Sequence, residues 1–409
     1  MIEPEMKKEY AELIVKRAVN LQQGQPLLVR TELGQRDFAR KLAEAAYENG
    51  ASLVKIDFTD PVLSRMRVDR AGKEEYLDFV PSHYMKMSDC YLEDGWASIA
   101  LRGAEYPDIM EGADSGRVGR VNRALSVAKS HFLKGISANK IAWNVCLFPT
   151  EAWAEKVLGG RDKWEERIWK VLKPILRLDS DDPSKAWREH DGELKRRCRY
   201  MNEKRFGGIH FTGPGTDLYV KMAPDRIFAG GSCINSRGVR FFPNIPTEEI
   251  FSTPDHTGTE GHVRTTRPVE VLGTEVRGAW FRFSRGRVVE FGADENRDIL
   301  AQYLDFDEGA SALGEVALVD AGSPIFKSGK TFYNILLDEN AACHIALGNG
   351  YSDCIEKGTE MTDEQLREVK CNSSLVHTDF MIGSREISVY GVNEDGTETL
   401  IIDEGEFII

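Results

Sequence analysis

The chain has 409 residues, of which 41% are hydrophobic and 29% charged, and its formal net charge is -13. This is the profile of a soluble globular protein long enough for two domains. The negative charge argues against a general affinity for nucleic acid or an anionic membrane. No apolar run approaches the roughly 20 residues of a membrane span, and the charged amino terminus lacks the apolar segment of a secretory signal. We therefore expect a cytoplasmic protein.

The first half of the chain alternates between helical and strand patterns. Residues 4–22 carry apolar side chains at helical spacing, and Gly24 follows them as a stop signal. A second helix is predicted over residues 36–50. Strands are predicted at four places, which are 26–31, 51–58, 97–102 and 140–149. Strand–helix alternation of this kind predicts a mostly parallel sheet covered by helices.

The pattern of predicted secondary structure changes after a long charged segment. Asp182-Pro183 starts an amphipathic helix with charges of both signs, and from Gly207 onward short strand-like runs separated by turn residues dominate. We place a domain boundary near residue 205. This predicts an α/β domain over 1–205 with a mostly parallel sheet, and a strand-rich α+β domain over 206–409.

Several familiar motifs are absent. The chain has no HExxH zinc helix, and SGKT at 328–331 lacks the first glycine of a phosphate-binding loop because that position holds Pro324. The seven cysteines are scattered without a CxxC pair, which is typical of reduced thiols. Cys343 adjoins a histidine, but on a strand its side chain would face away from it. We expect Cys343 to be a small buried apolar residue.

Two carboxy-terminal segments place histidines in otherwise apolar surroundings. His344 begins HIALGNGY, and His377 lies two residues before Asp379 in VHTDF, so that on a strand both of the latter side chains share a face. Glu249 and Glu315 are further carboxylates in ordered contexts. Two histidines and three carboxylates suit a pair of divalent ions such as Zn²⁺, Co²⁺ or Mn²⁺. Such a pair indicates hydrolysis of a peptide or a phosphate bond.

Three blocks of this sequence resemble those of a known family. They are NIPTEEIFSTPDH (244–256), FYNILLDENAACHIALGNGY (332–351) and VHTDFMIGS (376–384). They are similar to the blocks of the thermophilic-type metalloaminopeptidases, the family of aminopeptidases T and S. Shorter matches upstream, such as RLDSDDPSKAW and FTGPGTDLYV, extend the resemblance over nearly the whole chain.

The resemblance implies a site, an activity and an assembly. The family's metal ligands fall on five residues, Glu249, Glu315, His344, His377 and Asp379, and its metal-facing tyrosine falls on Tyr351. The implied enzyme is an aminopeptidase that removes the amino-terminal residue from peptides. The implied fold carries the metals in a strand-rich carboxy-terminal domain, and the family forms homodimers.

Roles within this site are expectations. We expect Glu315 to bridge the two ions and Tyr351 to donate a hydrogen bond to the developing oxyanion. Glu315 is also our first choice as general base. Glu248 adjoins a ligand but would face the other way on a strand.

Two other functions stay open. Distant relatives of the family use a similar frame to hold one iron for ring-cleaving dioxygenation, and a catalytically silent peptide-binding module is conceivable. Metal stoichiometry separates the three functions, because they require two divalent ions, one iron or none.

Overall fold

The computed structural model describes residues 3–409, and the chain forms two compact units. The first comprises Met1–Arg188 and Ser232–Pro246, and the second Glu189–Gly231 and Thr247–Ile409. This division differs from the single boundary predicted near 205. Helix α8 (Pro183–Lys204) runs from the first unit into the second, and residues 232–246 return to the first. None of the helices in the described residues is long and apolar enough to cross a membrane.

The first unit is built on a five-stranded sheet in the order β2-β1-β3-β4-β9, and every neighbouring pair is parallel. This confirms the predicted α/β architecture. The strands are β1 (Leu27–Glu32), β2 (Val54–Thr59), β3 (Ala97–Arg102), β4 (Trp143–Leu147) and β9 (Asn244–Ile245). The sequence did not predict β9, because two residues carry no periodic pattern.

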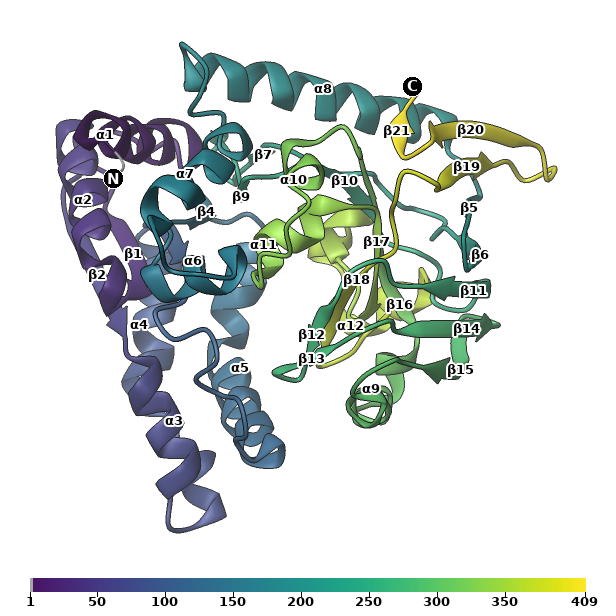
Figure 1. Ribbon diagram of the computed structural model, residues 1–409, viewed down its shortest axis with the longest axis horizontal. Helices are drawn as coiled ribbons and strands as arrows, with labels where there is room; N and C mark the ends of the chain where they lie inside the picture. The colour runs from purple at the N-terminus through teal and green to yellow at the C-terminus, as the bar shows by residue number, and fades with distance from the viewer. Residues whose placement is uncertain (1–2) are drawn as a thin grey trace. The chain divides into compact units, whose positions relative to one another are not determined.

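Helices of the first unit precede, link and follow these strands (Figure 1). They are α1 (Pro4–Leu13), a π-helical turn (Ile14–Ala18), α2 (Arg36–Glu48), α3 (Pro61–Arg70), α4 (Ser82–Glu93), α5 (Ser115–Ser137), α6 (Glu151–Leu158) and α7 (Trp164–Ile175), with 3-10 turns at Leu33–Gln35 and Glu74–Leu77. A two-stranded ribbon, β7 (Cys233–Ile234) with β8 (Arg240–Phe241), also belongs to this unit.

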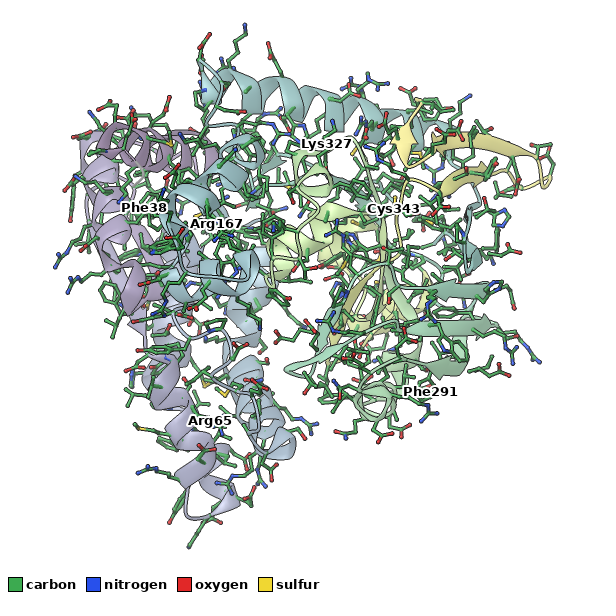
Figure 2. The ribbon with its side chains drawn as sticks, in the orientation of Figure 1. Phe38, Arg65, Arg167, Phe291, Lys327 and Cys343 are labelled. Atoms are coloured by element: carbon green, nitrogen blue, oxygen red, sulfur yellow. The ribbon has the colours of Figure 1, made fainter. Side chains whose placement is uncertain are left out.

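Aromatic and aliphatic side chains cover the two faces of the parallel sheet. Phe38 on α2, which is labelled in Figure 2, stacks against Tyr10 and Phe148 with ring centroids 5.3 and 4.0 Å apart. On the opposite face, Leu28 packs in a cluster with Phe132 of α5 and with side chains of α4. Side chains alternate along β1, so even-numbered residues face α4 and α5.

The second unit contains two antiparallel sheets, as the strand-rich prediction requires. The larger has eight strands in the order β15-β14-β11-β6-β5-β19-β20-β21, and the smaller has four in the order β10-β16-β17-β18. The larger comprises β5 (Gly208–Gly213), β6 (Thr216–Lys221), β11 (Glu260–Arg264), β14 (Trp280–Ser284), β15 (Arg287–Gly292), β19 (Ser388–Val392), β20 (Glu398–Asp403) and β21 (Glu406–Phe407). The smaller comprises β10 (Glu249–Ser252), β16 (Leu313–Val319), β17 (His344–Gly348) and β18 (His377–Met381).

The remaining elements of the second unit are short. They are the ribbon β12 (Val269–Val271) with β13 (Thr274–Val276), the helices α9 (Arg297–Leu304), α10 (Pro324–Lys327), α11 (Ile335–Asp338) and α12 (Asp363–Glu368), and 3-10 turns at Glu308–Ser311, Glu339–Ala341, Ser352–Cys354 and Gly358–Glu360.

One hydrophobic core joins the inner faces of the two antiparallel sheets. The smaller sheet contributes Val316, Ile345 and Leu347, and the larger contributes side chains such as Phe211 and Phe281. Because side chains alternate along each strand, the residues between these core positions point to the opposite face of the smaller sheet. That second face carries the polar site described below.

A histidine bridges three strands of the larger sheet on the face away from the core. His210 on β5 places Nδ1 2.8 Å from a Glu398 carboxylate oxygen and Nε2 2.8 Å from Asp217. Burial alone would lower the pKa of His210, but the hydrogen bonds to Asp217 and Glu398 raise it above the ordinary value. Both ring nitrogens donate only when the imidazole is protonated, so the charged form is favoured.

Candidate metal centre

The register of the smaller sheet brings the five predicted ligands onto one face. Glu315 lies opposite Ala346, which in turn lies opposite Asp379 on the next strand. His344 pairs with Ala317 of β16, and His377 pairs with Gly348. Glu249 is added from the edge strand β10, where it pairs with Val319. All these positions are an even number of residues apart on their strands, so their side chains share a face.

Small residues leave room at the centre of this face. Ala317 and Ala346 are completely buried and occupy the two central strands. Ala346 lies directly between Glu315 and Asp379 in the register. A methyl group there fills little of the space between two carboxylates. The polar side chains can therefore converge above the alanines.

The ligand atoms of the five residues form two groups that share Glu315. Glu249, Glu315 and His344 form one group, and Glu315, His377 and Asp379 form the other, with the atoms of each within 4.8 Å of one another. Within the second group, His377 Nε2 lies 3.2 Å from oxygens of both Glu315 and Asp379. In the first, His344 Nε2 lies 3.5 Å from Glu249.

Both histidines present Nε2 to the carboxylates. His344 Nδ1 lies 3.2 Å from the carbonyl oxygen of Ala342, and His377 Nδ1 lies 2.7 Å from that of Asn349. A carbonyl only accepts, so Nδ1 carries the proton in each ring. In the neutral rings Nε2 then offers a lone pair, which is the usual arrangement of a metal-ligating histidine.

The site has more acceptors than donors, which fits bound cations. Asp379 Oδ1 is buried and, apart from its contact with His377 Nε2 at 3.2 Å, has no hydrogen-bond partner among the described residues. Burial raises the pKa of Glu249 to about 8, against the opposing charge of His344. Uncompensated carboxylates are costly to bury, and a cation removes the cost. The donor set of imidazole nitrogens and carboxylate oxygens suits zinc, cobalt or manganese.

A tight turn after β17 brings Tyr351 back beside the ligand groups. Gly348, at the end of β17, has a φ of +107°, and an added Cβ would lie 2.1 Å from the Val376 carbonyl oxygen. Asn372 Nδ2 donates to the Gly348 carbonyl over 2.6 Å. The Tyr351 hydroxyl ends 3.2 Å from His377 Nε2. Burial, and then the charge of Glu315, raise the pKa of Tyr351 well above its ordinary value, so the hydroxyl stays protonated.

Sequence reasoning missed one acidic residue of this region. Glu339 begins a 3-10 turn and is partly buried. Burial, and then the charges of Glu249, Asp379 and Glu315, raise its pKa well above the ordinary value. It therefore adds a fourth carboxylate near the site. Its position five residues before His344, inside the block that carried the resemblance, was the available signal.

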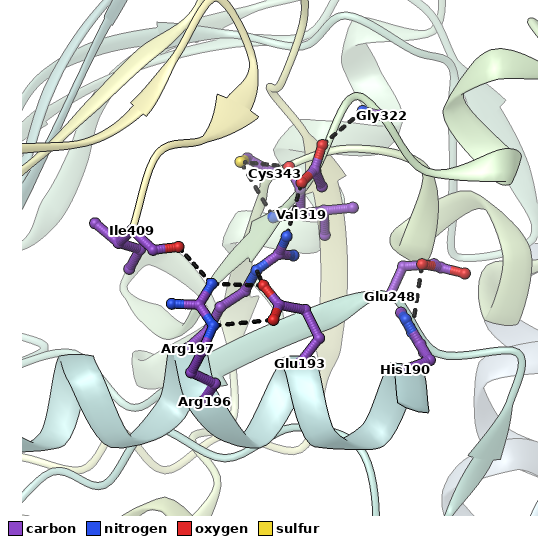
Figure 3. A network of polar contacts seen from close by, with 10 residues as sticks. His190, Glu193, Arg196, Arg197, Glu248, Val319, Gly322, Cys343 and Ile409 are labelled. Carbon is purple, nitrogen blue, oxygen red and sulfur yellow. Dashed lines mark hydrogen bonds and ion pairs between the residues drawn. The ribbon is translucent and has the colours of Figure 1, made fainter. Parts of the chain in front are cut away.

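Neighbouring groups hold the strands that carry the site. Glu248, next to Glu249, turns instead toward His190 on α8, whose Nε2 lies 3.4 Å from it (Figure 3). Arg197 on α8 binds Asp320, just after β16, over 2.9 Å. Cys343 is buried, and its Sγ lies 3.3 Å from the Val319 amide. These contacts separate Glu248 and Cys343 from the ligand groups, as the strand alternation predicted.

Comparison with known proteins places this geometry among proteases. The model of the family "Thermophilic metalloprotease (M29)" matches residues 4–407. Aminopeptidase T from Thermus aquaticus is 39% identical over 401 residues, which is 98% of this chain and 97% of the relative. Aminopeptidase 2 from Geobacillus stearothermophilus is 38% identical over 401 residues, with the same coverage.

A solved structure agrees with the sequence comparisons. Wild-type AmpT from Thermus thermophilus superposes with a TM-score of 0.92 at 37% sequence identity. The match covers 99% of both chains. The predicted fold class is thereby confirmed over essentially the full length.

Proposed function

The chain belongs to the thermophilic metalloprotease (M29) family, and on that premise we propose that it is an aminopeptidase working with two divalent metal ions. The relatives compared above are named aminopeptidases. The observation that carries the proposal of two ions is the pair of ligand groups that overlap in Glu315. One group alone would suffice for a single ion.

Each of the two ligand groups would hold one ion. Glu249 and His344 would hold one ion, His377 and Asp379 the other, and Glu315 would be shared by both. Ions bound there would activate water and polarise the scissile carbonyl. We add Glu339 to the site as a further acidic residue, because burial and then the charges of three ligand carboxylates raise its pKa. Zinc, cobalt and manganese are the metals proposed.

The proposed pair of ions favours a substrate with a free amino terminus. An ion held by one ligand group would accept the lone pair of an uncharged α-amine, while an ion held by the other would polarise the scissile carbonyl. An acetylated terminus offers no such lone pair. This preference would make the enzyme an exopeptidase.

Tyr351 and one carboxylate complete the proposed chemistry. The protonated Tyr351 hydroxyl would donate a hydrogen bond to the oxyanion that develops on the carbonyl oxygen. Glu315 remains our first choice for the residue that accepts a proton from the attacking water. The first role rests on the place of the Tyr351 hydroxyl beside His377, and the second on the membership of Glu315 in both ligand groups.

The proposal is tested with three versions of one short peptide. The versions have free ends, an acetylated amino terminus, or an amidated carboxy terminus. Chelation should abolish release of the first residue, and Co²⁺, Zn²⁺ or Mn²⁺ should restore it. Acetylation should prevent cleavage, while carboxy-terminal amidation should matter little. Equal cleavage of the free and acetylated peptides would overturn the exopeptidase proposal.

The other functions raised by the sequence are less well supported. The ring-cleaving dioxygenase finds no support among the relatives compared here. The homodimer remains a proposal from the family resemblance, and the cytoplasmic location remains a proposal from the composition and the charged amino-terminal sequence. Size-exclusion chromatography with light scattering tests the first of these directly.

A further inference from the structure

A second group of charged residues lies in the first unit. Arg30 on β1 is an even-numbered residue, so it faces α4 and α5 together with Leu28. Its guanidinium carbon lies 5.4 Å from the centre of the Phe132 ring on α5. Lys129 precedes Phe132 by three residues, which places it on the same side of that helix.

A third cation joins them from the neighbouring strand. Arg30 pairs with Ala100 of β3, and its Nη2 reaches the Ser98 hydroxyl over 3.4 Å. Ser98, Ala100 and Arg102 alternate onto the same face of the sheet. Arg102 is the last residue of β3 and is exposed, while Arg30 and Lys129 are partly buried. Arg30, Arg102 and Lys129 therefore form one cluster, here called the cation cluster.

The cation cluster has no ion-pair partner among the residues that the structure describes. Arg30 Nε is buried and makes no hydrogen bond at all. Burial, and then the charges of Arg30 and Arg102, lower the pKa of Lys129, as expected for three cations close together.

Two carboxylates lie near the cation cluster without forming an ion pair with it. Asp57 is the register partner of Arg30 on β2, and it pairs with Lys55 over 2.8 Å. Glu32 shares the face of Arg30, and it accepts the backbone N–H of Glu105 over 2.6 Å. These carboxylates compensate the positive charge of the cluster only in part, which leaves a cost for the partly buried groups.

Arg102 ends β3, at the edge of the sheet where α/β proteins bind ligands, and Arg30 lies two residues before the end of β1. In the order β2-β1-β3, the strand that follows β1 in the chain lies on one side of it, and the next strand, β3, lies on its other side. Ligands of such sheets bind beyond the carboxyl ends of the strands at this reversal. The backbone N–H groups of Gly34 and Glu105 at this edge are taken by Glu105 and Glu32. A ligand here would be held by side-chain cations and not by a glycine-rich phosphate loop.

We propose that Arg30, Arg102 and Lys129 form a binding site for an oxyanion, the phosphate or carboxylate group of a small molecule. Guanidinium groups hold such anions through paired, charge-assisted hydrogen bonds. An ammonium group adds a third donor and a compact charge. The three cations come from two neighbouring strands and from a helix whose Phe132 contacts Arg30.

Titration calorimetry on the full, metal-loaded chain tests this proposal. Inorganic phosphate and succinate are titrated separately, with potassium chloride holding the ionic strength constant. We expect phosphate, succinate or both to bind at one site per chain. The difference between their dissociation constants shows which oxyanion is preferred. Lys129→Gln and Arg102→Gln should each weaken that binding about tenfold or more, as expected for one lost charge-assisted hydrogen bond. Arg102 is exposed, and Lys129 lies on a helix outside the sheet, so their replacement spares the sheet.

A matched control removes a cation outside the cluster. Lys86 is exposed on α4, and Lys86→Gln should leave the affinity unchanged. Aminopeptidase activity checks that each variant is folded. Absence of saturable binding for both anions would overturn the proposal. So would binding that persists unchanged in Lys129→Gln and Arg102→Gln, because the anion would then sit elsewhere, for example on the metals.

Discussion

Replacing Tyr351 with Phe removes one hydroxyl and leaves the turn that carries it. The hydroxyl lies 3.2 Å from His377 Nε2, and the ring packs against Phe251 with centroids 5.6 Å apart. Phe keeps the ring contact and deletes only the donor. If the hydroxyl stabilises the oxyanion, kcat should fall on the order of 10²–10³-fold, equivalent to about 2.7–4 kcal/mol. KM should change little, because the interaction forms in the transition state.

A structural role for the same hydroxyl predicts a different result. Losing one buried hydrogen bond costs about 0.5–1.5 kcal/mol of folding stability and leaves kcat intact. Tyr303→Phe is the matched control. The buried Tyr303 hydroxyl donates to the carbonyl oxygen of Leu347 on β17 over 2.7 Å. The control should lose stability and keep its kcat.

The assay compares steady-state hydrolysis of an aminoacyl anilide by the wild-type protein and the two variants. Metal content is measured in the same samples, and urea unfolding reports stability. Near-normal kcat in a metal-replete Tyr351→Phe protein would refute a catalytic role for this hydroxyl. An equal loss of kcat in both variants would show that the effect is not specific to Tyr351.

Three further changes probe the fold and the site. Gly348→Ala forces a side chain onto a φ of +107° and into a backbone carbonyl oxygen. Urea unfolding should therefore show that the free energy of unfolding falls by about 3 kcal/mol or more. Gly396→Ala, at positive φ in open space, should lower it less. Ala346→Val should weaken metal binding in a competition titration by filling the space between two carboxylates, whereas Ile345→Val on the core face should cost only about 0.5–1.5 kcal/mol of stability. His210→Gln should lower the melting temperature more at pH 5.5 than at pH 9. The folded-state pKa of this histidine is raised, so its stabilisation is present at low pH and is lost as pH rises through that pKa; equal losses at both pH values would contradict this.

Local patterns predicted the parallel sheet well because its elements are regular. The predicted strand 97–102 coincides with β3, the predicted strand 26–31 lies one residue before β1 at each end, and the predicted helix start at 36 agrees with α2. The division of the chain was harder to foresee. Strand β9, which pairs with β4, lies beyond residue 205 in the sequence. A strand of two residues forms because of its tertiary pairing, and the periodicity of the sequence gives no sign of it.

The site could be predicted in its residue types but not in its geometry. His377 and Asp379 are close in sequence, so strand alternation alone places them on one face. The convergence of Glu249 with His344 depends on the register of β10, β16 and β17, which only the folded sheet reveals. Glu339 lies in a short 3-10 turn without periodicity, so only its position inside the block 332–351 set it apart from other acidic residues.

Metal stoichiometry is the most direct test of the proposed dinuclear aminopeptidase. Metal-free protein is titrated with Co²⁺ or Zn²⁺ while bound metal and peptide hydrolysis are measured on the same samples. We predict that activity appears with metal and that binding saturates at two ions per chain. In His344→Ala, which removes a ligand from one group only, the number of tightly bound ions should fall and activity with it. Saturation at one ion per chain, or full activity in the metal-free protein, would contradict the proposal.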